Sequence, residues 1–114
     1  MYDCCIEGPI ARKNNKAFGD KRERQVKELL VFEGWEVRKA RMSFGNADLL
    51  AFNHYTKERR LIQVKGTKAG PYADFGPASR QALLDDAIIA GASAWLAHWP
   101  AHGELKWYES KEWP

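Results

Sequence analysis

The sequence predicts an α/β fold in which helices flank a mixed β-sheet, with the elements in the order αβββαββ. Two segments with apolar residues at helical spacing are separated by three short strand-like segments, and two more strand-like segments follow the second helix. The length of 114 residues suits one domain, and a content of 45% hydrophobic and 12% aromatic residues is typical of folded chains. We expect a flexible basic arm over residues 1–16 and a single domain over residues 17–114.

The first helix is expected from Phe18 to about Gly34, because glycine commonly ends a helix. Its apolar positions are Val26, Leu29, Leu30 and Phe32. Strand character then appears in WEVRKARM (35–42), ADLLAFN (47–53) and RRLIQVK (59–65). Short links join these segments, so they predict an antiparallel meander.

The second half of the chain begins with a loop over residues 66–77, which holds three Gly and two Pro. ASRQALLDDAIIA (78–90) predicts the second helix, and Gly91 is placed to end it. The segments 93–99 and 104–110 are expected to be strands that flank the turn PAHG (100–103). Two roles are open for the 66–77 loop: a clamp over a ligand or a plain surface loop.

The positive charge is concentrated in one part of the chain. Residues 12–68 hold 15 Lys and Arg against 7 Asp and Glu, whereas residues 69–114 carry a net charge of −3. A concentrated positive region favours binding to polyphosphate backbones, although a solvated charged surface is a common alternative. No apolar stretch is long enough to cross a bilayer, so we expect a soluble, cytoplasmic protein without a membrane partner.

Polar residues in the strand-like segments are candidates for a functional site. Gln63 and Lys65 share one face of the 59–65 strand, and a hairpin would bring Asp48 beside them. Glu23 lies on the face of the first helix expected to pack on the sheet. Burying such groups together is costly unless they pair or are used. Each one alone has an ordinary alternative. Asp48 fits an acid in a turn, Lys65 fits a lysine at the end of a strand, and Glu23 fits one half of a solvated ion pair on a helix.

Converging acids next to a lysine are suited to metal-dependent phosphodiester hydrolysis. Mg²⁺ takes oxygen ligands and retains several waters, so two or three protein oxygens are enough. Such a cation neutralises phosphate charge and lowers the pKa of a bound water, and a nearby ammonium group stabilises developing charge. Lys65 is the candidate for that ammonium group.

ADLLAF followed by LIQVKGTK resembles the signature of PD-(D/E)XK nucleases, and the rest of the chain narrows the likeness. The GxxxER motif from Gly19 to Arg24 and the phrase EGWEVRKARMSFGNADLLA are similar to archaeal-type Holliday junction resolvases over roughly residues 16–113. The resemblance implies a restriction-endonuclease-like core and a homodimer that cuts four-way DNA junctions with Mg²⁺, or with Mn²⁺ in its place.

The resemblance also implies the site residues. Glu23, Asp48 and Lys65 match the family's catalytic positions, and Ser43 matches a serine that contacts the scissile phosphate. Gln63 departs from the usual glutamate. The total charge of the three side-chain ligands is therefore −2 and not −3, which predicts weaker metal binding. The metal ligands are then expected to be Glu23, Asp48, Gln63 and the backbone carbonyl of Val64.

Other roles follow from the distribution of residues. The expected DNA contacts are Arg12, Lys13, Lys16, Arg22, Arg24, Arg38, Lys39, Arg41, Arg59, Arg60, Lys68 and Arg80. Arg80 and Gln81 either face the site or form a polar helix start. The tryptophans at 95, 99, 107 and 113 are expected to serve as core and dimer contacts. A zinc site made of Cys4, Cys5, His98 and His102 is disfavoured by its spacing.

Two other functions stay open at this point. A structure-specific or restriction-like endonuclease on the same fold would cut linear duplexes or flaps as readily as junctions. A catalytically weak protein that binds junctions without cutting them is the other, and Gln63 is the residue that favours it.

Overall fold

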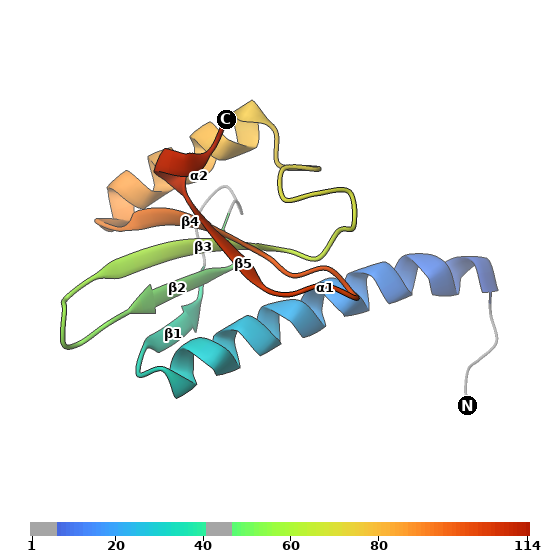
Figure 1. Ribbon diagram of the computed structural model, residues 1–114, viewed down its shortest axis with the longest axis horizontal. Helices are drawn as coiled ribbons and strands as arrows, with labels where there is room; N and C mark the ends of the chain where they lie inside the picture. Colours follow the sequence, from blue (N-terminus) through green and yellow to red (C-terminus); the bar gives the residue numbers. More distant parts are fainter. Residues whose placement is uncertain (1–6, 41–46) are drawn as a thin grey trace.

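A computed structural model describes residues 7–40 and 47–114, with side chains from residue 17 onward. The order of elements is the predicted αβββαββ, followed by a short 3₁₀ helix (Figure 1). The elements are α1 (Glu7–Phe32), β1 (Glu36–Lys39), β2 (Leu49–Phe52), β3 (Arg59–Lys65), α2 (Pro77–Ala90), β4 (Ser93–His98), β5 (Lys106–Glu109) and η1 (Ser110–Glu112).

The five strands form one mixed sheet in the order β1-β2-β3-β4-β5. The first three strands pair antiparallel, as the short links between them predict. β4 pairs parallel to β3 because the chain crosses over through α2 between them, and β5 returns antiparallel to β4. The expected mixed sheet with flanking helices is confirmed.

Helix α1 is longer than predicted, because it begins at Glu7 and not at Phe18. The irregular arm expected over residues 1–16 is therefore wrong for residues 7–16, while residues 1–6 lie outside the described part. Pro9 is tolerated in the first turn, where backbone N–H groups have no helical partner. The helix ends at the predicted place, where Gly34 has a φ of 100° and the Trp35 N–H bonds to the carbonyl of Leu30.

Two apolar clusters hold the layers together, one on each face of the sheet. α1 packs Val26 and Leu30 on one face, and α2 packs Leu83 and Ala87 on the other (Figure 1). β3 contributes to both, because successive side chains alternate between the faces. Ile62 belongs to the α1-side cluster, whereas Leu61 belongs to the α2-side cluster with Phe75 from the 66–77 loop.

The tryptophans pack against the protein's own core, as the first of their two expected roles requires. Trp35, Trp95, Trp99 and Trp107 are half-buried against the α1-side cluster, and Trp113 is half-buried against the α2-side cluster. The large apolar side chains that are exposed among the described residues lie elsewhere: Val31, Phe32, Tyr55, Ile88 and Ile89. Neither helix, as far as it is described, combines the length and apolarity of a membrane-spanning segment.

Candidate active site

Three strands bring their polar residues to the same end of the sheet. β1 ends at Lys39, β3 ends at Lys65, and Asp48 immediately precedes β2, which runs in the opposite direction. Because neighbouring antiparallel strands place opposite termini side by side, all three residues gather at this end. We call it the Lys65 end of the sheet.

Asp48 is held by backbone hydrogen bonds on either side of Gln63. Its N–H donates to the carbonyl of Ile62 at 2.9 Å, and its Oδ2 accepts a hydrogen bond from the N–H of Val64 at 2.8 Å. The hairpin predicted from the sequence therefore does bring Asp48 beside Gln63.

Three charged side chains act on Asp48 from different elements. Burial is the largest cause that raises the pKa of Asp48 above its usual value, and the hydrogen bond from Val64 opposes it. The Glu23 carboxylate raises this pKa further, whereas Lys65 and Lys39 lower it. Glu23, Asp48 and Lys65, which lie far apart in the sequence, therefore interact electrostatically in the folded chain.

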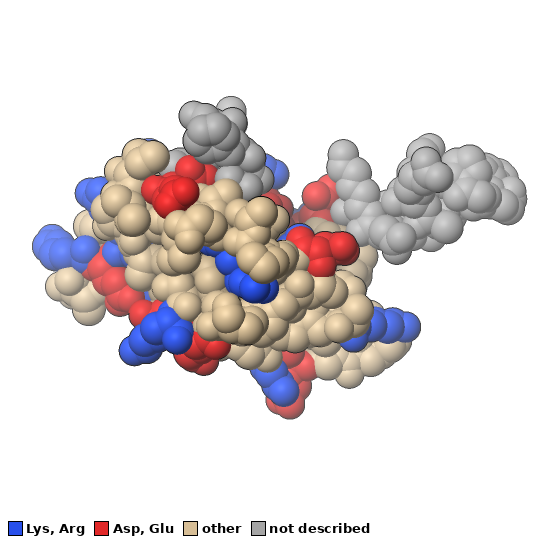
Figure 2. All heavy atoms as spheres, turned by 90° about the horizontal axis from the view of Figure 1, so that it is seen from above, with Lys and Arg blue, Asp and Glu red and all other residues tan. Residues whose placement is uncertain are grey.

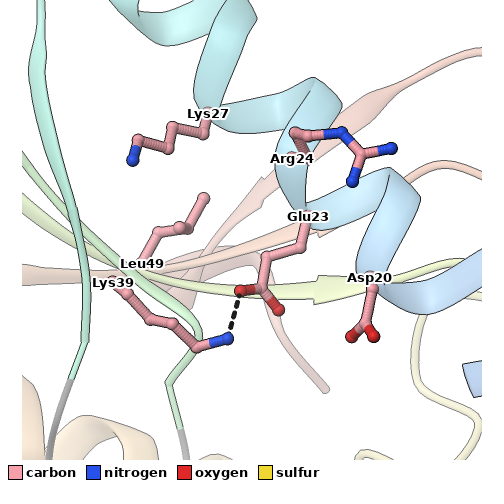
Figure 3. A pocket seen from close by; sticks show the side chains of 6 residues that line it. All are labelled: Asp20, Glu23, Arg24, Lys27, Lys39 and Leu49. Atoms are coloured by element: carbon pink, nitrogen blue, oxygen red, sulfur yellow. Dashed lines mark ion pairs between the residues drawn. The ribbon is translucent and has the colours of Figure 1, made fainter. Parts of the chain in front are cut away.

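Glu23 reaches this end of the sheet from α1. Its Oε1 lies 3.0 Å from Nζ of Lys39, and the Glu23 side chain is only 18% exposed (Figure 3). Their hydrogen bond is the main cause that raises the pKa of Lys39. The pair lines a cavity of about 410 Å³ whose walls are Asp20, Glu23, Arg24, Lys27, Lys39 and Leu49.

Gln63 and Lys65 approach from the other face of the sheet. They alternate along β3 with Ile62 and Val64, which pack on the α1 side. Asp48 lies at the strand ends between the two faces, where it interacts with both Glu23 and Lys65. Within the described residues the Gln63 side chain has no hydrogen bond or ion pair, so its role as a ligand stays a prediction.

The donor set at the Lys65 end fits an oxygen-coordinated divalent cation with few protein ligands. Two carboxylates that repel each other have lower energy when a cation lies between them. Among the described residues, Asp48 uses only Oδ2 and Glu23 only Oε1, which leaves one oxygen of each available. The described residues include no group of three or more His, Cys, Asp or Glu that could hold a metal, so further ligands would be Gln63, the Val64 carbonyl and water.

The disfavoured zinc site receives no support from His98, one of its two histidines. His98 is buried at the end of β4, and its Nε2 lies 2.7 Å from the carbonyl oxygen of Thr67. That nitrogen is therefore committed to holding the start of the 66–77 loop. Cys4 and Cys5 lie outside the described residues.

Five of the predicted DNA contacts are exposed on the surface, namely Arg24, Arg38, Lys39, Arg59 and Lys68. The side chains of Arg12, Lys13 and Lys16 are not described, and Arg41 and Ser43 lie outside the described residues. Seen from the α2 side, the surface shows isolated basic side chains interspersed with acidic ones, without a continuous basic patch (Figure 2).

Three of the arginines expected to contact DNA make contacts within the protein. Arg22 is buried, and its guanidinium bonds to the carbonyls of Trp99 and Pro100. Arg60 pairs with Glu58. Arg80 donates to the carbonyl of Phe75 at 2.8 Å and so holds the 66–77 loop to α2.

Gln81 bonds within its own helix, because its amide donates to Oδ1 of Asp85 one turn further along α2. The alternative of a polar helix start is the one that the structure supports for Arg80 and Gln81. Sequence patterns give no signal for these partners, since most of them are backbone carbonyls that every residue carries.

Comparison with known proteins adds information about the fold. No protein-family model and no curated protein matches the sequence. Among solved structures, Hjc from Archaeoglobus fulgidus, a Holliday junction resolvase from an archaeal hyperthermophile, superposes with a TM-score of 0.66 and 20% identity. The match covers 77% of this chain and 75% of that chain. The predicted α/β, restriction-endonuclease-like fold is therefore confirmed, and the chain has the fold of a resolvase.

Proposed function

We propose that this protein is a metal-dependent endodeoxyribonuclease that resolves four-way DNA junctions by paired, symmetric nicks. The observation that carries the proposal is the convergence of Glu23, Asp48 and Lys65 at one end of the sheet. This convergence occurs on a fold shared with a Holliday junction resolvase. Mg²⁺ is the proposed cofactor, and Mn²⁺ is expected to substitute for it.

Each residue of the site has a separate task in this proposal. Glu23, Asp48, Gln63 and the carbonyl of Val64 would hold the cation, which when bound supplies charge neutralisation at the phosphate and an acidified water. Lys65 orients the attacking water and stabilises the negative charge that develops on the phosphate oxygens. The water oxygen forms a bond to phosphorus and its proton passes to solvent, while the P–O3′ bond breaks and O3′ takes a proton from solvent. A 5′-phosphate and a 3′-hydroxyl remain.

A homodimer follows from the geometry of the substrate. A four-way junction has two-fold character, and two sites related by a two-fold axis would cut opposed strands at equivalent positions. We propose that the duplex arms are held through phosphate contacts, which respond to the shape of the junction more than to its bases. Arg24, Lys39 and Lys68 are exposed basic residues proposed for such contacts.

Cleavage assays test this proposal directly. Labelled four-way junction, linear duplex and flap DNA are incubated with Mg²⁺ or Mn²⁺ and with wild type, Lys65→Ala or Lys106→Ala. Lys106 is an exposed lysine on β5 and serves as the matched charge control. We expect symmetric junction nicks that persist in Lys106→Ala and fall by at least about a hundredfold in Lys65→Ala.

Two other outcomes would replace the proposal. Equal cutting of linear duplex or flap DNA would indicate a different endonuclease on the same fold. Binding of the junction without cutting, in both metals, would indicate a junction-binding protein. Gln63 favours that second function, because a neutral amide stands where a third carboxylate would strengthen cation binding.

A further inference from the structure

We propose that Arg22 is a positioning residue that fixes Glu23 relative to Lys65 by joining α1 to the turn after β4. The proposal rests on the proposed function, since it concerns two residues of that site. The residues involved are Phe18 and Arg22 on α1, with Trp99 and Pro100 in the turn, and we call them the Arg22 cluster.

The guanidinium of Arg22 is held by three strong hydrogen bonds. Nε donates to the carbonyl of Trp99 at 2.9 Å, Nη2 donates to the carbonyl of Pro100 at 2.7 Å, and Nη1 donates to Oε1 of Gln25 at 2.8 Å. The residue is only 7% exposed. A planar group with several donors in fixed directions specifies both the distance and the orientation of its partners.

Two aromatic rings complete the environment of this guanidinium. Its carbon lies 4.4 Å from the centroid of the Trp99 ring and 4.8 Å from that of Phe18. Among the described residues no carboxylate pairs with Arg22, so its charge is stabilised by rings and carbonyl dipoles. Burying an arginine in this way is costly unless its partners are well ordered, which is the property that a positioning residue needs.

Trp99 connects the Arg22 cluster to the backbone of Lys65. The Trp99 N–H donates to the Lys65 carbonyl at 2.8 Å, while its own carbonyl accepts from Arg22. A continuous path therefore runs from Glu23 across one peptide bond to Arg22, through a hydrogen bond from the Arg22 side chain to Trp99, and through a second hydrogen bond from Trp99 to Lys65.

Close packing at Gly66 supports the same arrangement from a second direction. A Cβ at Gly66 would lie 2.7 Å from Cε2 of Phe18 and 3.5 Å from Cγ of Arg22. Helix α1 thus packs directly on the backbone that follows Lys65, and only a glycine allows this approach. Contact with DNA phosphates, the role expected for Arg22 from the sequence, is incompatible with a buried guanidinium that is already bonded.

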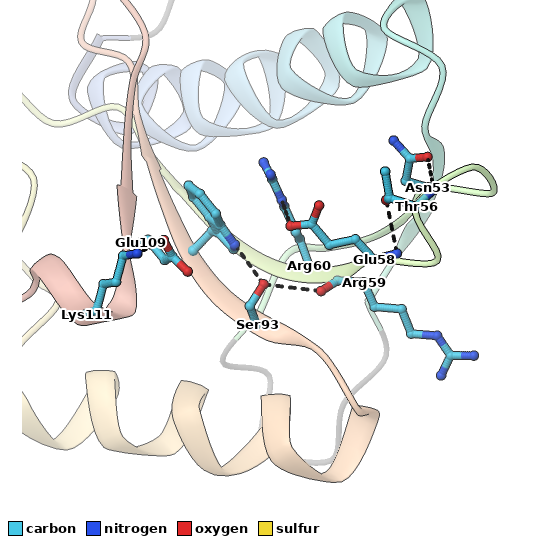
Figure 4. Close-up of polar contacts among 9 residues, drawn as sticks. Asn53, Thr56, Glu58, Arg59, Arg60, Ser93, Glu109 and Lys111 are labelled. Atoms are coloured by element: carbon cyan, nitrogen blue, oxygen red, sulfur yellow. Dashed lines mark hydrogen bonds and ion pairs between the residues drawn. The ribbon is translucent and has the colours of Figure 1, made fainter.

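The test uses Arg22→Met, which keeps an unbranched apolar stem and removes the guanidinium donors, and Arg22→Lys, which keeps the charge without the fork. Arg60→Met is the matched control (Figure 4). Arg60 also stacks on two rings, with its guanidinium carbon 4.7 Å from the Trp35 centroid and 4.1 Å from the Trp95 centroid, and it pairs with Glu58. It lies near the other end of β3, about 17 Å from Lys65 at 3.3 Å per residue.

Two readouts are independent of DNA cleavage. The first is the nuclear Overhauser effect between the Phe18 ring and the Gly66 α-protons in the metal-free protein. The second is the affinity for Mn²⁺ measured by calorimetry. We expect Arg22→Met to lose the Phe18–Gly66 signal and to bind Mn²⁺ about tenfold more weakly than wild type. Arg22→Lys should have values between those of Arg22→Met and wild type. Arg60→Met should match wild type in both, at a comparable loss of thermal stability.

The proposal is overturned if Arg22→Met, or Arg22→Lys where the first variant does not fold, keeps both the Phe18–Gly66 signal and wild-type Mn²⁺ affinity. It is also overturned if Arg60→Met lowers Mn²⁺ affinity equally, because Arg22 would then act through stability alone. A wild-type protein that binds no Mn²⁺ and cuts no junction would refute the proposed function instead. In that case the Phe18–Gly66 signal decides whether Arg22 fixes α1.

Discussion

The N–H of Val64 donates a 2.8 Å hydrogen bond to Oδ2 of Asp48, so the backbone of one strand holds the carboxylate at the start of its neighbour. This bond favours the ionised carboxylate, yet burial and the Glu23 carboxylate outweigh it and raise the pKa of Asp48. The metal-free protein therefore contains an acid whose ionisation opposes folding.

Asp48→Asn should stabilise the metal-free protein at pH 7, since Asn keeps an acceptor for Val64 and carries no charge that burial and Glu23 oppose. With a raised native pKa, wild-type stability falls as pH rises from the ordinary range of an aspartate through the native pKa. Urea denaturation at several pH values should show this decline in wild type and a smaller one in the variant. A variant less stable than wild type at pH 7 would contradict the expected direction.

Lys39→Met should increase Mn²⁺ affinity by about threefold to tenfold, because the Lys39 ammonium group lies 3.0 Å from an oxygen of Glu23 and competes with a cation. Calorimetric titration measures the change, which should shrink at high ionic strength. Lys27→Met is the control: it lines the same cavity and forms no ion pair among the described residues. Weaker Mn²⁺ binding in Lys39→Met would show that Lys39 orients Glu23 for the cation.

Gln63→Glu should strengthen Mg²⁺ binding by roughly tenfold, because it adds a negative charge to a site with two carboxylates. The same substitution should destabilise the metal-free protein through repulsion with Asp48. Metal titrations and thermal unfolding, each with and without Mg²⁺, separate the two effects. Identical titrations of both forms would refute a role for residue 63 as a ligand.

Gly66→Ala should lower the unfolding free energy by about 1–3 kcal/mol, because the added methyl group meets the Phe18 ring. Gly19→Ala is the contrasting control: it lies within α1 and its new Cβ meets nothing within 4 Å. That variant should gain about 0.5–1 kcal/mol from helix propensity. Chemical denaturation of both variants checks the opposite signs, and equal effects would rule out the contact with Phe18.

Most of the fold follows from local patterns in the sequence. Alternating apolar residues and short links predict β1 to β3, and the apolar spacing before Gly91 predicts α2 to within one residue. The first turns of α1, EGPIARKNNK (7–16), carry no apolar stripe at helical spacing. Periodicity therefore could not reveal that part of the helix.

The candidate site was only partly predictable, and for a different reason. Glu23, Asp48 and Lys65 are chemically distinctive, and their positions in the predicted helix and strands are enough to predict that they converge. The role of Arg22 depends on carbonyls 77 and 78 positions later in the chain. Because every residue carries a carbonyl, no composition or spacing distinguishes a surface arginine from this buried one.

The position of Trp99 also has a consequence for protein synthesis. A ribosome completes Glu23, Asp48 and Lys65 well before it adds Trp99, whose backbone joins α1 to the end of β3. An emerging chain that stops short of β4 thus carries the chemical groups without the scaffold that aligns them. Under the proposed function, nucleolytic competence would arise only after β4 and the turn that follows it have been synthesised and have docked on α1.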